Sequence, residues 1–135
     1  MTEIKTLRRI LTDYKRVAVV GLSDNSTRPS NVVAKYLLRQ GFEVIPVNPK
    51  YDEILGQKCY PDLTSIPTPV DIVDLFRRIE HVPPLVDDAI AIGAKVVWMQ
   101  LDIVHEEAAQ KARAAGLEVI MNRCIKIEYA RLFGD

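Results

Sequence analysis

Three short polar stretches carry side chains suited to binding phosphate, and each follows an apolar run of the chain. The first turns at a glycine and adds a serine and an arginine, the second pairs an amide with a lysine, and the third places two arginines beside a phenylalanine. A glycine turn lets backbone N–H groups approach a phosphate, and guanidinium and ammonium groups neutralise its charge. The residues are Gly21, Leu22, Ser23, Asp24, Arg28, Asn48, Pro49, Lys50, Phe76, Arg77 and Arg78. We therefore expect a nucleotide-phosphate site.

The spacing of these stretches restricts the kind of nucleotide. Gly21 is the only glycine between residues 17 and 30, so the G-x-G-x-x-G pattern of dinucleotide binders is missing. Where an NAD-binding protein places a carboxylate for the ribose hydroxyls, this chain has Asn48 and Lys50. A lysine favours a nucleotide that carries a ribose phosphate, such as NADP or coenzyme A. The alternative for each stretch is an ordinary polar loop with solvated charges.

Strands and helices are expected to alternate along the chain. Apolar runs bounded by glycine, proline or charge predict strands over 17–20, 42–47, 71–76, 95–101 and 117–121. Helical periodicity predicts helices over 3–13, 30–41, 82–92, 105–115 and 125–133, with Ser30 capping the second. Residues 51–69 are expected to be irregular, with a short extended piece at 58–60 and a helical turn at 63–66.

This alternation predicts an α/β fold, a Rossmann-like three-layer sandwich around a doubly wound, mainly parallel five-stranded sheet. Numbering the expected strands along the chain, we expect the order 3-2-1-4-5 and a ligand crevice at the carboxyl ends beside the first strand. Gln100 lies near the carboxyl end of the fourth strand and could hydrogen-bond a ligand. Trp98 on the same strand is expected in the core.

Composition excludes several classes of protein. The 135 residues suit one domain, and the 18 acidic and 18 basic side chains balance, so neither nucleic acid nor an anionic membrane is expected as a partner. Cys59 and Cys124 lack metal-ligand spacing and are expected to be reduced thiols. No stretch resembles a signal peptide or approaches the ~20 apolar residues of a membrane span. These features predict a cytoplasmic protein.

Five blocks in order resemble the small stand-alone coenzyme A-binding proteins, which are similar to the N-terminal coenzyme A-binding domain of the succinyl-CoA synthetase alpha subunit. The blocks are 21–23 with 28–30, 47–49, 71–78, 97–100 and 122–126. The resemblance runs from about Leu7 to Phe133. It implies one coenzyme A-binding domain over residues 1–135, of which 1–15 form an N-terminal helical segment.

By this resemblance, the turn at 21–24 would hold the phosphates of the coenzyme, 48–50 would lie near its ribose phosphate, and 76–78 would line the same groove. The chain departs from the family pattern at two positions. Asp102 stands where glycine is expected, and Asn122 stands where aspartate is expected before Arg123. The departures affect the loops after the fourth and fifth strands, not the phosphate contacts.

Residues suited to catalysis are sparse. His81 and His105 lie near expected helix starts, with no matching nucleophile or metal partner in the sequence. Asp71 and Asp74 are three residues apart, which places them on opposite faces of a strand. Neither a nucleophile elbow nor a P-loop occurs, and the second domain of the synthetase is not expected in this chain.

We therefore expect binding of coenzyme A or a short acyl-CoA without catalysis. A mixed disulfide between the coenzyme thiol and Cys124 has no support from a recognisably activated thiolate. Two other classes stay open: an NADP-linked oxidoreductase, and a regulatory or interaction protein with a vestigial nucleotide crevice. The sequence indicates no protein partner.

Overall fold

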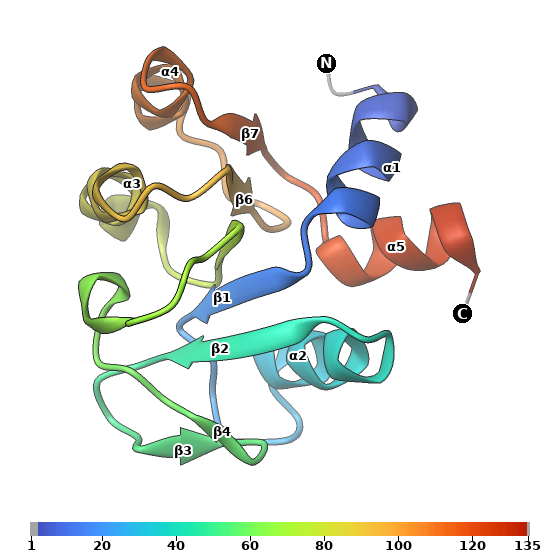
Figure 1. Cartoon of the computed structure of the whole chain (residues 1–135), viewed down its shortest axis with the longest axis vertical. Helices are drawn as coiled ribbons and strands as arrows, with labels where there is room; N and C mark the ends of the chain where they lie inside the picture. Colours follow the sequence, from blue (N-terminus) through green and yellow to red (C-terminus); the bar gives the residue numbers. More distant parts are fainter. Residues whose placement is uncertain (1–2, 135) are drawn as a thin grey trace.

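A five-stranded parallel sheet forms the middle layer of the computed structural model, which describes residues 3–134 (Figure 1). Its strands are β1 (Arg16–Val20), β2 (Glu43–Val47), β5 (Ile72–Leu75), β6 (Val96–Met99) and β7 (Glu118–Ile120). The helices are α1 (Ile4–Asp13), α2 (Pro29–Arg39), α3 (Val82–Ala91), α4 (Glu106–Ala114) and α5 (Ile125–Phe133). All ten expected strands and helices are therefore confirmed within a few residues of their ends. Residues 1, 2 and 135 of the expected domain lie outside the described part.

Helices cover both faces of the sheet. In Figure 1, α1, α2 and α5 lie on one side, and α3 and α4 lie on the other. Alternate residues of β1 enter the two cores: Val17 and Val19 pack with the first group, and Ala18 and Val20 with the second. Both faces being buried explains why the strand is apolar without alternation. No helix within residues 3–134 is long and apolar enough to cross a membrane.

The strand order differs from the expected 3-2-1-4-5. The sheet runs β2-β1-β5-β6-β7, so the third long strand, β5, pairs with β1 and β6. Counted along the chain, the order is 2-1-3-4-5, the other common doubly wound arrangement. The prediction that the third long strand would pair with the outer edge of the second strand was wrong.

Contacts at both ends of the connection between β2 and β5 account for this order. The connection forms a small hairpin from β3 (Glu53–Ile54) and β4 (Gln57–Lys58), then returns so that Tyr60 bonds Pro46 and Asn48 of the β2 segment. This contact covers the outer edge of β2. A 3₁₀ turn, Leu63–Ser65, then lies on the α3 side of the sheet. At the start of β5, the Asp71 carboxylate accepts the N–H groups of Lys15 and Arg16, which places β5 beside β1.

Gly21, which directly follows β1, and Phe76, which directly follows β5, are thereby brought together. Chain connections leave β1 and β5 in opposite directions across the sheet, which makes the gap between their carboxyl ends the switch point where doubly wound proteins bind ligands. The crevice was expected beside the first strand. That is where the sheet changes the direction in which strands are added.

Asp74 is a fully buried carboxyl group in the middle of the sheet. It lies level with Val19 on β1 and Trp98 on β6, and neither carboxyl oxygen has a hydrogen-bond partner among the described residues. Burial without a compensating charge raises the pKa of Asp74 well above its ordinary value. The side chain is therefore neutral in the folded protein over a wider pH range than in the unfolded chain.

This raised pKa predicts a pH dependence of stability. The unfolded chain releases the Asp74 proton near pH ~3.9, while the folded protein keeps it, so the free energy of unfolding should fall as pH rises from there to the folded-state pKa. Asp74→Asn removes this contribution. Chemical denaturation over that range should show a gentler decline for the variant, and parallel curves for the two proteins would contradict the prediction.

Candidate functional site

The backbone of Gly21 passes very close to the segment that follows β5. Gly21 has φ +86°, and a Cβ atom added to it would lie 2.4 Å from the carbonyl oxygen of Phe76 and 2.9 Å from Cδ of Arg77. Its N–H donates to Val47 O, and Phe76 N–H donates to Val20 O. Only a residue without a side chain fits here, so glycine allows the ends of β1, β2 and β5 to meet.

Asn48 ties the loop after β2 to the loop after β1. Its Nδ2 donates to Leu22 O at 3.0 Å, and its Oδ1 accepts the N–H of Lys50 at 3.0 Å. The side chain therefore positions the two loops, and both of its amide atoms already have protein partners. Asn48 still lines the pocket beside Lys50.

The start of α2 is tied to the same turn. Ser23 N–H donates to Ser30 Oγ at 3.0 Å, and Asn31 Nδ2 donates to Ser23 O at 2.8 Å. Ser30 was expected to cap the helix, which is wrong: Arg28 is the N-cap, because Pro29 takes the first helical position with its preset φ. The Ser30 hydroxyl still has its own proton to donate, and its N–H belongs to the first turn, which lacks intrahelical acceptors.

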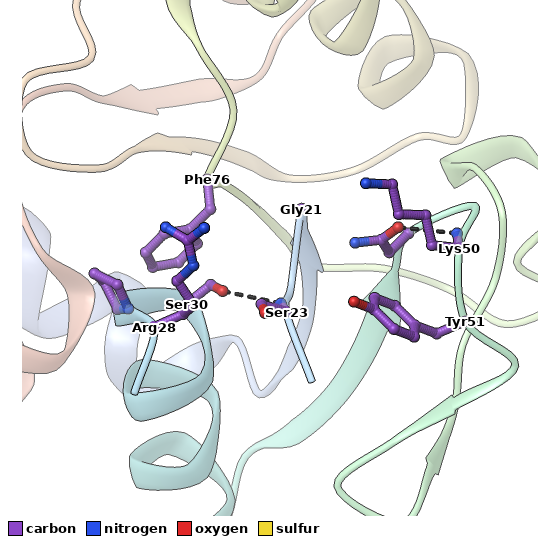
Figure 2. Close-up of a pocket in the computed structure, with 9 residues that line it drawn as sticks. Gly21, Ser23, Arg28, Ser30, Lys50, Tyr51 and Phe76 are labelled. Carbon is purple, nitrogen blue, oxygen red and sulfur yellow. Dashed lines mark hydrogen bonds between the residues drawn. The ribbon is translucent and has the colours of Figure 1, made fainter. Parts of the chain in front are cut away.

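These loops enclose a cavity of about 370 Å³ and an adjoining one of about 290 Å³. Together they form what we call the cationic pocket, lined by Gly21, Ser23, Arg28, Pro29, Ser30, Asn48, Pro49, Lys50, Tyr51, Phe76 and Arg77. Figure 2 shows Arg28 and Ser30 on one side of the Gly21 turn, and Lys50 and Tyr51 on the other. The three polar stretches expected to converge are therefore brought to one place.

Three cations, Arg28, Lys50 and Arg77, line this pocket, and Arg78 comes next in the chain. Within residues 3–134, no carboxylate forms an ion pair with Arg28, Lys50, Arg77 or Arg78. By contrast, Arg123 and Arg131 are paired with the buried carboxylate of Glu128. Unpaired positive charge at one edge of a neutral protein produces a local field that attracts polyanions.

A second cavity, of about 490 Å³, opens beside the cationic pocket and shares Pro29, Phe76 and Arg77 with it. We call it the apolar cavity; its other lining residues are Val33, Arg78, Gln100, Leu101, Ile103 and Cys124. Gln100, the expected site residue on β6, therefore faces this cavity and not the cationic pocket. A ligand with a charged end and an apolar end could occupy both.

Two expected site residues do not line these cavities. The side chain of Leu22 is fully buried in the core, so only its backbone is at the turn. Asp24 is exposed, and its hydrogen bond with the Tyr51 hydroxyl raises the pKa of Tyr51. Asp24 is therefore placed beside Tyr51, a residue of the cationic pocket, without lining the pocket itself.

The sequence interpretation missed Asn31 and Tyr51. Asn31 is buried in the first turn of α2, where its Oδ1 has no hydrogen-bond partner among the described residues. An asparagine at a helix start resembles an ordinary capping residue, so its pattern carried no signal of a site. Tyr51 follows two prolines and a lysine in a loop that the pattern left irregular.

The two departures from the family pattern contact each other. Asp102 has φ +67°, a left-handed conformation that glycine adopts most easily and that aspartate tolerates. Its N–H donates to Asn122 Oδ1 at 2.8 Å. This bond joins the loop after β6 to the loop after β7.

Fold and site place this chain among the doubly wound α/β proteins with a cation-rich pocket at the switch point of the sheet. The chain belongs to the CoA binding domain family, whose model matches residues 15–130. The resemblance inferred from the five sequence blocks is thereby confirmed.

Several known proteins are similar to the chain. It is 44% identical over 124 residues to the uncharacterized protein YneT of Bacillus subtilis, covering 92% of each chain. A hypothetical protein from Pyrococcus horikoshii has a solved structure that matches 98% of this chain, and 94% of its own, with a TM-score of 0.96 and 47% identity. The ADP-forming acetate–CoA ligase I of Archaeoglobus fulgidus is 30% identical over 121 residues. That match covers 82% of this chain but 18% of the ligase.

The close approach at Gly21 predicts an unusually large effect of a methyl group. Gly21→Ala should lower the free energy of unfolding by about 2–5 kcal/mol, because it combines a left-handed φ with an overlap against backbone. Gly41→Ala is the matched control: its φ is +89°, but nothing lies within 4 Å of its Cβ position. Its expected cost is the backbone preference alone, roughly 1–2 kcal/mol. If chemical denaturation gave the two variants equal losses of unfolding free energy, the predicted overlap at Gly21 would be contradicted.

Proposed function

We propose that the protein binds coenzyme A, free or as a short acyl thioester, and catalyses no reaction on it. The observation that carries this proposal is the set of cations without an ion pair: Arg28, Lys50 and Arg77 in the cationic pocket and Arg78 in the adjoining apolar cavity. Coenzyme A has three phosphate groups, more than NAD has, and a largely uncharged arm. The cationic pocket and the adjoining apolar cavity match this division of the ligand.

The diphosphate would lie at the Gly21 turn and the start of α2. There the ligand would meet a bare backbone turn, the Ser30 hydroxyl and the Arg28 guanidinium, and the positive end of the helix dipole favours an anion. The ribose phosphate would lie at Lys50, whose backbone is held by Asn48. Arg77 lines both the cationic pocket and the apolar cavity, so its charge can be reached from either side.

The comparisons support coenzyme A as the ligand. The matching family is described as a CoA binding domain, and the name of the similar archaeal ligase includes CoA. The ligase is a much longer protein, of which this chain matches 18%.

Binding without catalysis is supported by the roles of the candidate catalytic side chains. His105 Nδ1 accepts the N–H of Ala108 at 3.1 Å and caps α4, away from the cationic pocket. The Asp71 carboxylate accepts the backbone N–H groups of Lys15 and Arg16 at the start of β5. Each of these groups has a structural partner.

Thermal melting with a set of nucleotides tests the ligand class. Coenzyme A should raise the melting temperature more than NADP or NAD at equal concentration, because a ligand of the native state stabilises it by RT ln(1 + [L]/Kd). A shift with NADP but not with coenzyme A would contradict the proposal and favour an oxidoreductase. No shift with any of them would favour an interaction protein.

Lys50→Ala tests the place of the ribose phosphate. The loss of one charge-assisted contact should weaken coenzyme A binding by about 1.5–3 kcal/mol, while dephospho-coenzyme A binding should change little. Lys95→Ala removes a lysine next to the start of β6, at the opposite edge of the sheet, and serves as the control. Titration calorimetry that finds equal losses for both nucleotides would contradict a ribose phosphate at Lys50.

A further inference from the structure

The apolar cavity contains one polar side chain that is almost fully buried. Gln100 follows β6, is 5% exposed, and lines the cavity together with Val33, Ile103 and Cys124. Its Oε1 accepts the N–H of Ile125 at 3.1 Å. Ile125 begins α5, so this bond satisfies a backbone donor that has no acceptor within its own helix.

The bond to Ile125 determines which way the Gln100 amide points. A backbone N–H can only donate, so the atom facing it must be the oxygen, and the NH₂ group must point the other way. No residue within 3–134 accepts a hydrogen bond from Nε2. The Gln100 side chain lines the cavity, so a ligand acceptor there could take the bond that Nε2 otherwise makes to water.

Gln100 Nε2 lacks an acceptor among these residues. The group that suits it best is an acceptor without an N–H of its own, because Oε1 is already bonded to Ile125 and cannot serve a second donor equally well. An amide of the pantetheine arm carries both a carbonyl and an N–H, but Gln100 has only its donor to offer, because Oε1 is occupied by Ile125. A thioester carries a carbonyl oxygen and no N–H. The free thiol of coenzyme A has no carbonyl at that end. Among the groups at the end of the arm, a thioester therefore best matches the Gln100 donor, which has no acceptor in the described part of the protein.

We propose that the apolar cavity binds the acyl end of a short-chain acyl-CoA, with Gln100 Nε2 donating to the thioester carbonyl oxygen and the acyl chain lying against Val33, Ile103 and Cys124. This inference rests on the proposed binding of coenzyme A in the adjacent cationic pocket. It makes the protein selective for an acylated over a free coenzyme. No covalent step is involved.

Calorimetry with three ligands separates carbonyl recognition from burial of a chain. The ligands are coenzyme A, butyryl-CoA and S-butyl-CoA, a thioether that has the same four-carbon chain but lacks the carbonyl oxygen. Wild-type protein should bind butyryl-CoA about fivefold more tightly than S-butyl-CoA, the order of one neutral hydrogen bond. Both should bind more tightly than coenzyme A, because each buries additional methylene groups.

Gln100→Glu changes the donor and keeps the helix contact. The carboxylate can still accept the Ile125 N–H, but it presents an oxygen where Nε2 donated. The preference for butyryl-CoA over S-butyl-CoA should disappear, and this ratio of affinities is the measured quantity. Gln110→Glu adds the same charge on an exposed position of α4 and should keep the preference. The wild-type comparison stands even if the Gln100 variant folds poorly.

The other outcomes distinguish the two proposals. Equal binding of the thioester and the thioether by wild-type protein would overturn this inference while leaving coenzyme A binding intact. If Gln100→Glu weakened all three ligands equally, Gln100 would contact the pantetheine arm, and the acyl assignment would be overturned. If none of the three ligands bound, the proposed function itself would fail.

Discussion

The contact on which the site depends is the passage of Gly21 against the carbonyl group of Phe76. It joins the ends of β1 and β5 at a distance that no side chain permits. Because the sheet reverses its direction of growth between these strands, the contact also sets the floor of the cationic pocket. A single missing Cβ atom therefore links the topology of the sheet to the shape of its binding edge.

Polar side chains then hold the loops around this floor. Asn48 joins the β1 and β2 loops, Ser30 and Asn31 join the β1 loop to α2, and Asp24 holds Tyr51. These polar groups bond to backbone or to one another, whereas Arg28, Lys50, Arg77 and Arg78 form no ion pair within residues 3–134. The walls of the pocket are therefore arranged before a ligand arrives, so that binding costs little ordering entropy.

Much of this arrangement could be predicted from the sequence, for physical reasons that also explain the errors. Long apolar runs ended by glycine or proline define strands, and their carboxyl ends share one edge, so Arg28, Lys50 and Arg77 were expected to converge. The order of strands was not predictable in this way, because both free edges of a sheet are equally apolar. Bonds of Tyr60 to β2 and of Asp71 to β1 decide it, and such bonds leave no periodic pattern. The direction of the Gln100 amide likewise depends on a helix start distant in sequence.

The bond between Asp102 and Asn122 has a consequence for the charge of the loops after β6 and β7. The backbone N–H of residue 102 can donate to either an amide oxygen or a carboxylate oxygen at position 122. With aspartate at 102, however, a carboxylate at 122 would add a second negative charge beside the first, which like-charge repulsion disfavours. The amide at 122 therefore accepts the backbone N–H of Asp102 without placing a second carboxylate beside that of Asp102.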